Sequence, residues 1–230
     1  MTMGPEFFLI IALAIVGFIV QAKLKSVFKK YSKVMFSGGL TGAQVAEKML
    51  RDNGINDVQV THVAGHLTDH FNPATKTVNL SESVYSSNSV SAAAVAAHEC
   101  GHAIQHAEGY APLKLRSALV PATSFSSKYA FIFIIGGVLL ASYGGNSGMG
   151  WIFWIGIGML AVSAIFSIVT LPVEYNASAR ALAYLEDSGL VTGKEKAQAS
   201  EALSWAARTY LVAALSAVVT ILYYIGIARD

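Results

Sequence analysis

Four apolar stretches constrain this chain more than any other feature of its sequence. Each is long enough, or nearly so, to cross the hydrocarbon core of a bilayer, which takes about 20 helical residues. They cover residues 7–20, 129–143, 151–173 and 209–227. Hydrophobic residues make up 54% of the 230 residues and charged residues only 13%, which is more apolar than an ordinary soluble domain. The sequence therefore predicts a mainly α integral membrane protein with about four transmembrane helices.

The basic residues indicate which way the chain crosses the membrane. Positive charges follow the first apolar stretch and do not precede it, so we expect a retained anchor and not a cleaved signal peptide. If the chain starts outside, residues 22–128 and 174–208 face the cytoplasm and contain 15 of the 16 Lys and Arg. The positive-inside rule favours that orientation in the cell (inner) membrane. The segment 144–148 is expected to be an outer turn between the second and third spans.

Charge and cysteine content narrow the class further. The formal net charge is only +2, and the basic residues gather beside the apolar stretches, where anionic lipid attracts them. Nucleic-acid binding is therefore not expected. Cys100 is the single cysteine, so no internal disulfide is available, and a reducing, cytoplasm-facing environment fits best. We expect one membrane-anchored domain over residues 1–230, because the polar insertions are too short to be independent domains.

The first cytoplasmic part predicts a small α+β element. Thr41-Gly42-Ala43-Gln44 has the form of a capping box and opens an amphipathic helix that runs to Gly54. Residues 58–63 alternate apolar and polar side chains, and residues 76–81 form a second short extended run. The segment 69–73, which ends in Asn-Pro, has turn chemistry. We expect two or three strands here.

The next predicted helix carries the motif His98-Glu99-Cys100-Gly101-His102. Asn88, Ser89 or Ser91 can cap its start, and Gly109 stops it. Two histidines four residues apart on a helix project from the same face, so their imidazoles can converge on one zinc ion. Chance pairing on an alanine-rich helix is the alternative, but the motif lies within a well-formed helix, as its chemistry requires.

The other residues of the motif have different expected roles. Glu99 is rotated about 100° from His98, which keeps it from ligation but lets it accept the proton of a zinc-activated water. We therefore expect Glu99 to be the general base and then the general acid. Cys100 points away from the metal face and is interpreted as a small core residue.

A catalytic zinc needs a third protein ligand from elsewhere in the chain. The metzincin pattern would place a histidine at position 109, which is Gly109. Glu174, at the cytoplasmic end of the third span, is the better candidate, because carboxylates at the membrane edge are costly and usually functional. The alternatives are an acid favoured near a helix N-terminus after Pro172, or a partner for Arg180.

Three segments together resemble a known family. They are residues 67–73 (LTDHFNP), 89–106 (SVSAAAVAAHECGHAIQH) and 171–181 (LPVEYNASARA), and they resemble the neutral zinc metallopeptidases of bacterial membranes, the YugP-like family. These peptidases are similar to the gluzincins, especially the membrane type related to the heat-shock and CAAX prenyl proteases. The resemblance implies a zincin-like element with one zinc per chain and places the third ligand at Glu174. The related proteases usually have Asp where this chain has Ser178.

Several residues are candidates for supporting roles. Ligand imidazoles usually donate their second N–H to a carboxylate or carbonyl, and Asp69, Asn176 and Ser178 are all options for such a partner. His70 is interpreted as solvated or turn-stabilising, with hydrogen bonding to the oxyanion as the alternative.

Arg180 is expected to be structural, paired with Glu186 or an acid of the small element, with oxyanion support as the alternative. Gln105 faces the metal side more nearly than His106 does, and both are expected to bind backbone or water.

The function predicted from these residues is zinc-dependent endoproteolysis of membrane-associated or misfolded proteins. We expect the substrate backbone to pair with the strand around residues 78–80, by strand addition. The alternative is a zinc-stabilised membrane scaffold or adaptor with little turnover, although a scaffold needs no base at Glu99. A metal transporter is disfavoured, because the spans lack the several buried carboxylates or histidines that it would need.

Overall fold

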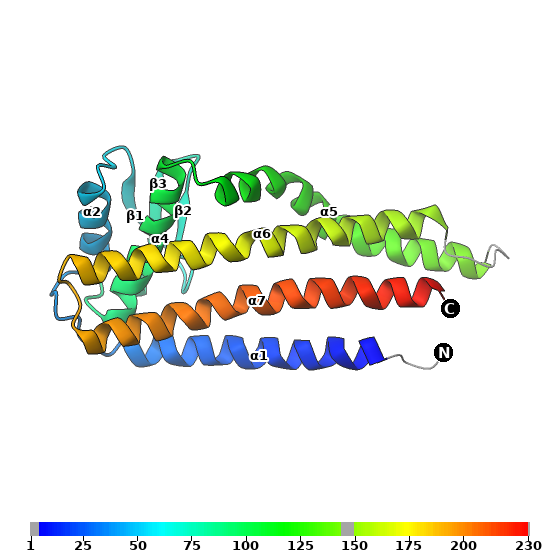
Figure 1. Cartoon of the computed structure of the whole chain (residues 1–230), viewed down its shortest axis with the longest axis horizontal. Coiled ribbons are helices and arrows are strands. Elements are labelled where there is room, and N and C mark those ends of the chain that lie inside the picture. Colours follow the sequence, from blue (N-terminus) through cyan, green and yellow to red (C-terminus); the bar gives the residue numbers. More distant parts are fainter. Residues whose placement is uncertain (1–4, 144–149, 230) are drawn as a thin grey trace. The chain divides into compact units, whose positions relative to one another are not determined.

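The computed structural model describes residues 5–143 and 150–229 (Figure 1), so the predicted outer turn at 144–148 lies outside the described residues. The chain divides into two compact units. Unit 1 comprises Met1–Ile19, Leu115–Leu171 and Thr209–Asp230, and unit 2 comprises Val20–Lys114 and Pro172–Arg208. The single domain over 1–230 stays a prediction.

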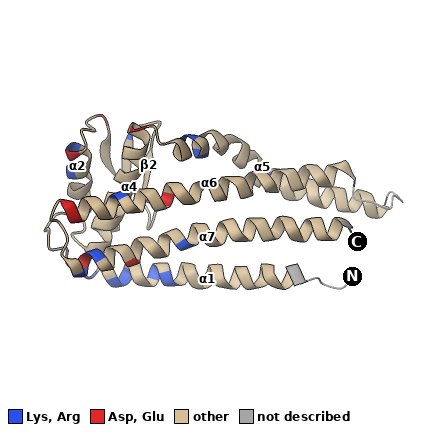
Figure 2. Ribbon diagram, in the orientation of Figure 1, with Lys and Arg blue, Asp and Glu red and all other residues tan. Residues whose placement is uncertain are grey.

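Within residues 5–143 and 150–229, four helices are long and apolar enough to cross a membrane. They are α1 (Pro5–Tyr31), α5 (Ala111–Tyr143), α6 (Trp151–Asp187) and α7 (Gly193–Arg229). Each contains one predicted apolar stretch, so the prediction of a mainly helical chain with four candidate spans is confirmed. Every helix is longer than its apolar stretch. Figure 2 shows that Lys and Arg gather on the parts of α1 and α7 that belong to unit 2.

The apolar surface of unit 1 suits contact with lipid. Large apolar side chains face outward along its helices, as Phe18 (78% exposed) and Ile132 (63% exposed) show. Exposed apolar surface on this scale marks an interaction with a partner or a membrane. Between α5 and α6 the backbones approach closely, because a Cβ on Gly137 would lie 2.6 Å from Phe153 and one on Gly156 would lie 2.6 Å from Ile134. Small residues commonly permit such close packing of membrane helices.

Unit 2 contains a three-stranded sheet formed by β1 (Gln59–Val63), β2 (His70–Asn72) and β3 (Thr77–Ser81). The strand order is β1-β3-β2, with β1 parallel and β2 antiparallel to β3. The third strand forms where a turn was expected, because Asn72 Oδ1 accepts hydrogen bonds from the backbone N–H groups of the following residues, which places the turn after Asn72.

The strand order corrects one expectation. β3 is the central strand and is paired on both sides, so residues 78–80 have no free edge for a substrate. The prediction that substrate pairs with this strand is wrong. Within the sheet, the outer edges belong to β1 and β2.

The predicted helices of unit 2 are confirmed. The helix α2 (Gly42–Asp52) has Thr41 as its N-cap and a complete capping box with Gln44. A short helix, α3 (Glu82–Tyr85), follows the sheet and leads to α4 (Val90–Ala107), whose N-cap is Ser89. Gly109 follows α4 with φ +68°, as a helix stop requires.

Alanines allow α4 to lie deep within unit 2. Ala92, Ala94, Ala96 and Ala97 are fully buried, and α4 contacts α2, α3, β2 and β3. The motif helix is thereby held by its packing in the hydrophobic core of unit 2.

The helix α6 is continuous through Pro172. The prediction had the third span end at residue 173, and one alternative made Glu174 an acid at the start of a new helix. That alternative is wrong, because Glu174 lies within α6, far from either end.

Candidate metal centre

The helices α4 and α6 bring together the three side chains that the sequence singled out as ligands. His98 Nε2 lies 3.2 Å and His102 Nε2 lies 3.6 Å from the same carboxylate oxygen, Oε2 of Glu174. The two imidazole rings are edge to face with centroids 4.8 Å apart. One ligand atom from each residue lies within 4.8 Å of the others.

This donor set fits zinc. Two imidazole nitrogens and one carboxylate oxygen are a known ligand combination of catalytic zinc sites, which keep a fourth position open. The side chains of His98, His102 and Glu174 are only 13%, 10% and 4% exposed. Buried polar and charged groups need hydrogen-bond or ionic partners. These three side chains are partners of one another here, and together they could bind a cation.

Gly101 explains how α4 approaches α6 so closely. A Cβ at Gly101 would lie 2.7 Å from the carbonyl oxygen of Ala177 and 3.1 Å from its Cα. Ala177 is itself fully buried. The glycine between the histidines therefore provides the space in which the Glu174 helix packs against the histidine helix.

Glu99 lies beside the three convergent side chains but makes a different contact. Its carboxylate oxygen Oε2 accepts a 3.0 Å hydrogen bond from the backbone N–H of Phe71 on β2. The residue is 8% exposed. Glu99 is thus placed between the histidine pair and the edge of the sheet.

The second nitrogen of each imidazole also has a partner. His98 Nδ1 lies 3.1 Å from Ser178 Oγ, and His102 Nδ1 lies 3.0 Å from Gln105 Oε1. Ser178 was among the predicted partners. Asn176, also among the predicted partners, accepts a 2.9 Å hydrogen bond from the Gln105 side chain through its Oδ1. Gln105 was expected to bind backbone or water, and its position three residues after His102 on the buried face of α4 was the signal for its role.

The other candidates bond to residues outside the three convergent side chains; they are Asp69, His70 and Arg180. The Asp69 carboxylate accepts hydrogen bonds from the N–H and hydroxyl of Ser81 and so holds the loop before β2. His70 is exposed, with Nδ1 2.8 Å from the Thr68 carbonyl oxygen, which suits the turn-stabilising interpretation. Arg180 forms a two-bonded pair with Glu108 at 2.7 and 2.9 Å, instead of with Glu186.

Two groups of α4 have shifted pKa values. Burial lowers the pKa of His102, but the contacts with the Glu174 and Glu99 carboxylates outweigh it, and the pKa is raised above the usual histidine value. Burial, and then the charge of Glu99, raise the pKa of the Cys100 thiol well above its ordinary value. The thiol of Cys100 is 3.5 Å from the Ala46 carbonyl. It is a neutral core group, as expected.

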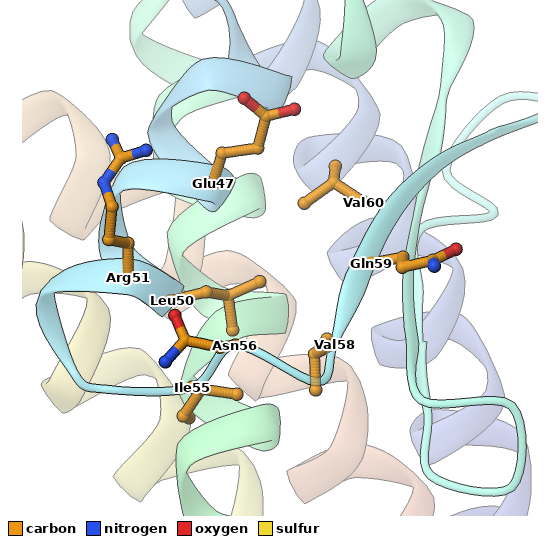
Figure 3. Close-up of a pocket in the computed structure, with 8 residues that line it drawn as sticks. All are labelled: Glu47, Leu50, Arg51, Ile55, Asn56, Val58, Gln59 and Val60. Atoms are coloured by element: carbon orange, nitrogen blue, oxygen red, sulfur yellow. The ribbon is translucent and has the colours of Figure 1, made fainter.

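A surface hollow of about 450 Å³ lies between α2 and β1. Figure 3 shows Glu47 and Arg51 of α2 on one side and Val60 of β1 on the other. It shares no lining residue with the metal centre.

Known proteins that are similar to this chain show its family. A family model described as "Putative neutral zinc metallopeptidase" matches residues 6–229. The chain is similar to "Putative membrane protease YugP" of Bacillus subtilis (strain 168), with 43% identity over 222 residues, which cover 96% of this chain and 95% of that protein. No solved structure matches the chain. With a family match over nearly its whole length, the chain belongs to the neutral zinc metallopeptidase family, as the resemblance of its motifs indicated.

Proposed function

We propose that this chain is a membrane-embedded, zinc-dependent endopeptidase that cleaves membrane-associated or misfolded proteins. The observation that carries the proposal is the convergence of His98 Nε2, His102 Nε2 and Glu174 Oε2, with the Glu99 carboxylate beside them. Family membership and four candidate spans support it.

His98, His102 and Glu174 are the residues that would hold one zinc ion per chain. Zinc supplies a Lewis acid that lowers the pKa of water towards 7 and polarises a peptide carbonyl. Ser178 and Gln105 orient the two imidazoles through their Nδ1 atoms. Partners of this kind fix ring orientation in zinc sites.

Glu99 carries the proton transfers. It accepts the proton of the attacking water and then donates it to the leaving amine, the two roles of one acid–base group in peptide hydrolysis. The Phe71 N–H engages Oε2 of Glu99. We assign the proton transfers to Oε1.

We place the substrate along β2. The Phe71 N–H points to Glu99, and β3 lies on the other side of the strand, so this N–H belongs to the outer edge. An extended peptide can add to a free sheet edge through main-chain hydrogen bonds. A peptide on the edge of β2 would run beside Glu99. A peptide could not pair with β3 in this way, because β3 is already paired on both sides.

The active site faces the cytoplasm in this proposal, because 15 of the 16 Lys and Arg lie in residues 22–128 and 174–208. Cysteine-accessibility labelling of Lys194→Cys and Ser147→Cys in a Cys100→Ala background tests it. Labelling of position 147 from the cytoplasmic side alone would invert the topology.

A Glu99→Gln variant tests the peptidase mechanism. The amide keeps an oxygen for the Phe71 N–H but cannot accept a proton at neutral pH, so the variant should keep zinc and lose activity by about a hundredfold to ten-thousandfold. The assay compares purified wild type and variant, both zinc-loaded in detergent, on an unfolded membrane protein. Equal cleavage by both proteins would refute the mechanism. Zinc-retaining inactivity in both would favour the scaffold alternative.

A further inference from the structure

Both polar atoms of the Gln105 side chain have hydrogen-bond partners. It is fully buried on α4. Its side-chain nitrogen donates one hydrogen bond of 2.8 Å to the Val173 carbonyl and another of 2.9 Å to Asn176 Oδ1. A primary amide nitrogen has two N–H groups and no acceptor, so both are used. The amide oxygen, Oε1, is left for His102 Nδ1 at 3.0 Å.

Two groups fix the donor and the acceptor of each hydrogen bond in the series that joins Arg180, Asn176, Gln105 and His102. The Val173 carbonyl can only accept, so Gln105 must present its nitrogen to it. The guanidinium of Arg180 can only donate, and its Nε lies 2.8 Å from Asn176 Oδ1. Asn176 must therefore present oxygen to Arg180 and to Gln105. A flipped amide at Gln105 or Asn176 would place acceptors against acceptors or donors against donors.

The fixed orientation of the Gln105 amide determines which nitrogen of His102 carries the proton. Oε1 of Gln105 is an acceptor only, so the His102 nitrogen that faces it must carry the proton. Glu174 Oε2 is also an acceptor, but it lies 3.6 Å from Nε2, farther than the 3.0 Å between Nδ1 and Gln105 Oε1, so it competes less well for the proton. In a neutral imidazole Nε2 is then the nitrogen with a free lone pair. A metal can bind only through that lone pair.

His98 is held differently. Its Nδ1 faces Ser178 Oγ at 3.1 Å, and a hydroxyl can donate or accept. Ser178 therefore does not dictate which nitrogen of His98 is protonated. His98 Nε2 lies 3.2 Å from the Glu174 carboxylate, an acceptor, so without metal the partners of His98 favour Nε2–H, whereas those of His102 favour Nδ1–H.

We propose that Gln105, locked by Val173 and by the Asn176–Arg180 pair, is a positioning residue that selects the Nδ1–H tautomer of His102 and so prepares Nε2 for zinc. The zinc part of this inference rests on the proposed function, but the tautomer does not. These hydrogen bonds continue to the surface, because the Arg180 guanidinium also donates to the exposed carboxylate of Glu108, the C-cap residue of α4. The same chain of contacts thereby ties the end of α4 to α6.

The tautomer can be read without zinc. ¹⁵N NMR of histidine-labelled, metal-free protein in detergent, at a pH well above the imidazole pKa, distinguishes Nδ1–H from Nε2–H. The His102 signal is assigned by its loss in His102→Ala. Wild type should show only the Nδ1–H form, and Gln105→Leu, which has no acceptor, should show a mixture or the Nε2–H form. Gln105→Glu keeps an acceptor for Nδ1 and should restore Nδ1–H, although its second oxygen loses the hydrogen bonds to Val173 and Asn176.

Ser178→Ala is the matched control, because it removes the partner of His98 and should leave the His102 tautomer unchanged. Zinc affinity is the second readout. Gln105→Leu should bind zinc about tenfold to a hundredfold more weakly than wild type, the usual range for such partners, and Gln105→Glu should recover part of that loss, because it keeps the acceptor but not the two donors.

These experiments test the role of Gln105 in selecting the tautomer separately from the assignment of His102 as a zinc ligand. An Nε2–H form in wild type, or an unaltered tautomer in a folded Gln105→Leu protein, overturns the proposal. If Gln105→Leu does not fold, the wild-type spectrum and Gln105→Glu still decide it. Undiminished zinc binding by His102→Ala would instead remove His102 as a ligand and leave the tautomer result standing.

Discussion

The backbone N–H of Phe71 donates a 3.0 Å hydrogen bond to the Glu99 carboxylate. This contact joins the outer edge of the sheet to the helix that carries both motif histidines. The N–H is not needed by the sheet, because β2 pairs with β3 along its other side. A single backbone group can therefore be removed to test both the placement of the base and the proposed path of the substrate.

Phe71→Pro removes that N–H, because proline has none, and leaves the pairing of β2 with β3 available. We expect kcat/KM to fall about tenfold to a hundredfold, since a hydrogen bond to a charged group contributes about 1.5–3 kcal/mol. Peptidase assays and metal analysis should show reduced cleavage with zinc retained.

Phe71→Ala is the matched control, because it also removes the ring, which stacks near His106, but keeps the N–H. It should retain more activity than Phe71→Pro. Equal losses in the two variants would show that the ring matters and that the edge N–H does not.

Local patterns predicted the parts of this fold that neighbouring residues determine. The capping box at Thr41 and Gln44 is present, and the motif helix begins after Ser89 and stops before Gly109. Histidines at positions 98 and 102 share a helix face for the same reason, since helical geometry fixes what lies four residues away. Glu174 is 76 residues from His98 along the chain, so helical spacing could not place it; its position at the membrane edge made it a candidate, and the resemblance to a family supported it.

The remaining features depend on packing between distant segments. The alternation of apolar and polar residues in 58–81 could not show that β3 is central. Strand order depends on contacts between separate segments, such as the hydrogen bond from Ser81 to Asp69. Arg180 finds Glu108 because α6 crosses the end of α4. Gln105 is three residues after His102 on the same helix, but its side chain is oriented by Val173 and Asn176 of α6, which local spacing could not show.

Zinc content should identify the ligands. His98→Ala, His102→Ala and Glu174→Ala should each lose most of the one zinc expected per chain, because a three-ligand site that loses one ligand binds metal poorly. Metal analysis of purified protein measures this. His106→Ala, on an exposed position of the same helix, should keep its zinc. Full zinc retention in Glu174→Ala would remove Glu174 from the ligand set.

Gly101→Ala should force α4 and α6 apart. The added methyl would lie 2.7 Å from the Ala177 carbonyl oxygen, and overpacking of this kind costs about 1–3 kcal/mol. We expect a lower Tm and weaker zinc binding, measured by thermal unfolding and metal titration. Gly136→Ala is the control, because its Cβ would meet nothing within 4 Å. If both variants behave like wild type, the close approach at Gly101 does not hold the site together.

The stabilisation by zinc should depend on pH in a definite direction. The contacts of His102 with the Glu174 and Glu99 carboxylates outweigh burial and raise its pKa in the metal-free protein. Protonated His102 therefore stabilises the metal-free fold fully below the unfolded pKa of about 6.5, and this contribution is lost as pH rises through the higher folded pKa.

Zinc acts in the opposite sense, because it binds only the neutral imidazole and must displace the proton. The increase in Tm on adding zinc should therefore grow from about pH 6 to about pH 8. Thermal unfolding with zinc and with a chelator measures it at each pH. His102→Ala should show only a small increase at any pH, because a ligand is missing. An increase in wild type that is the same at both pH values would mean that zinc displaces no histidine proton in this range, which contradicts the assignment of His98 and His102 as its ligands.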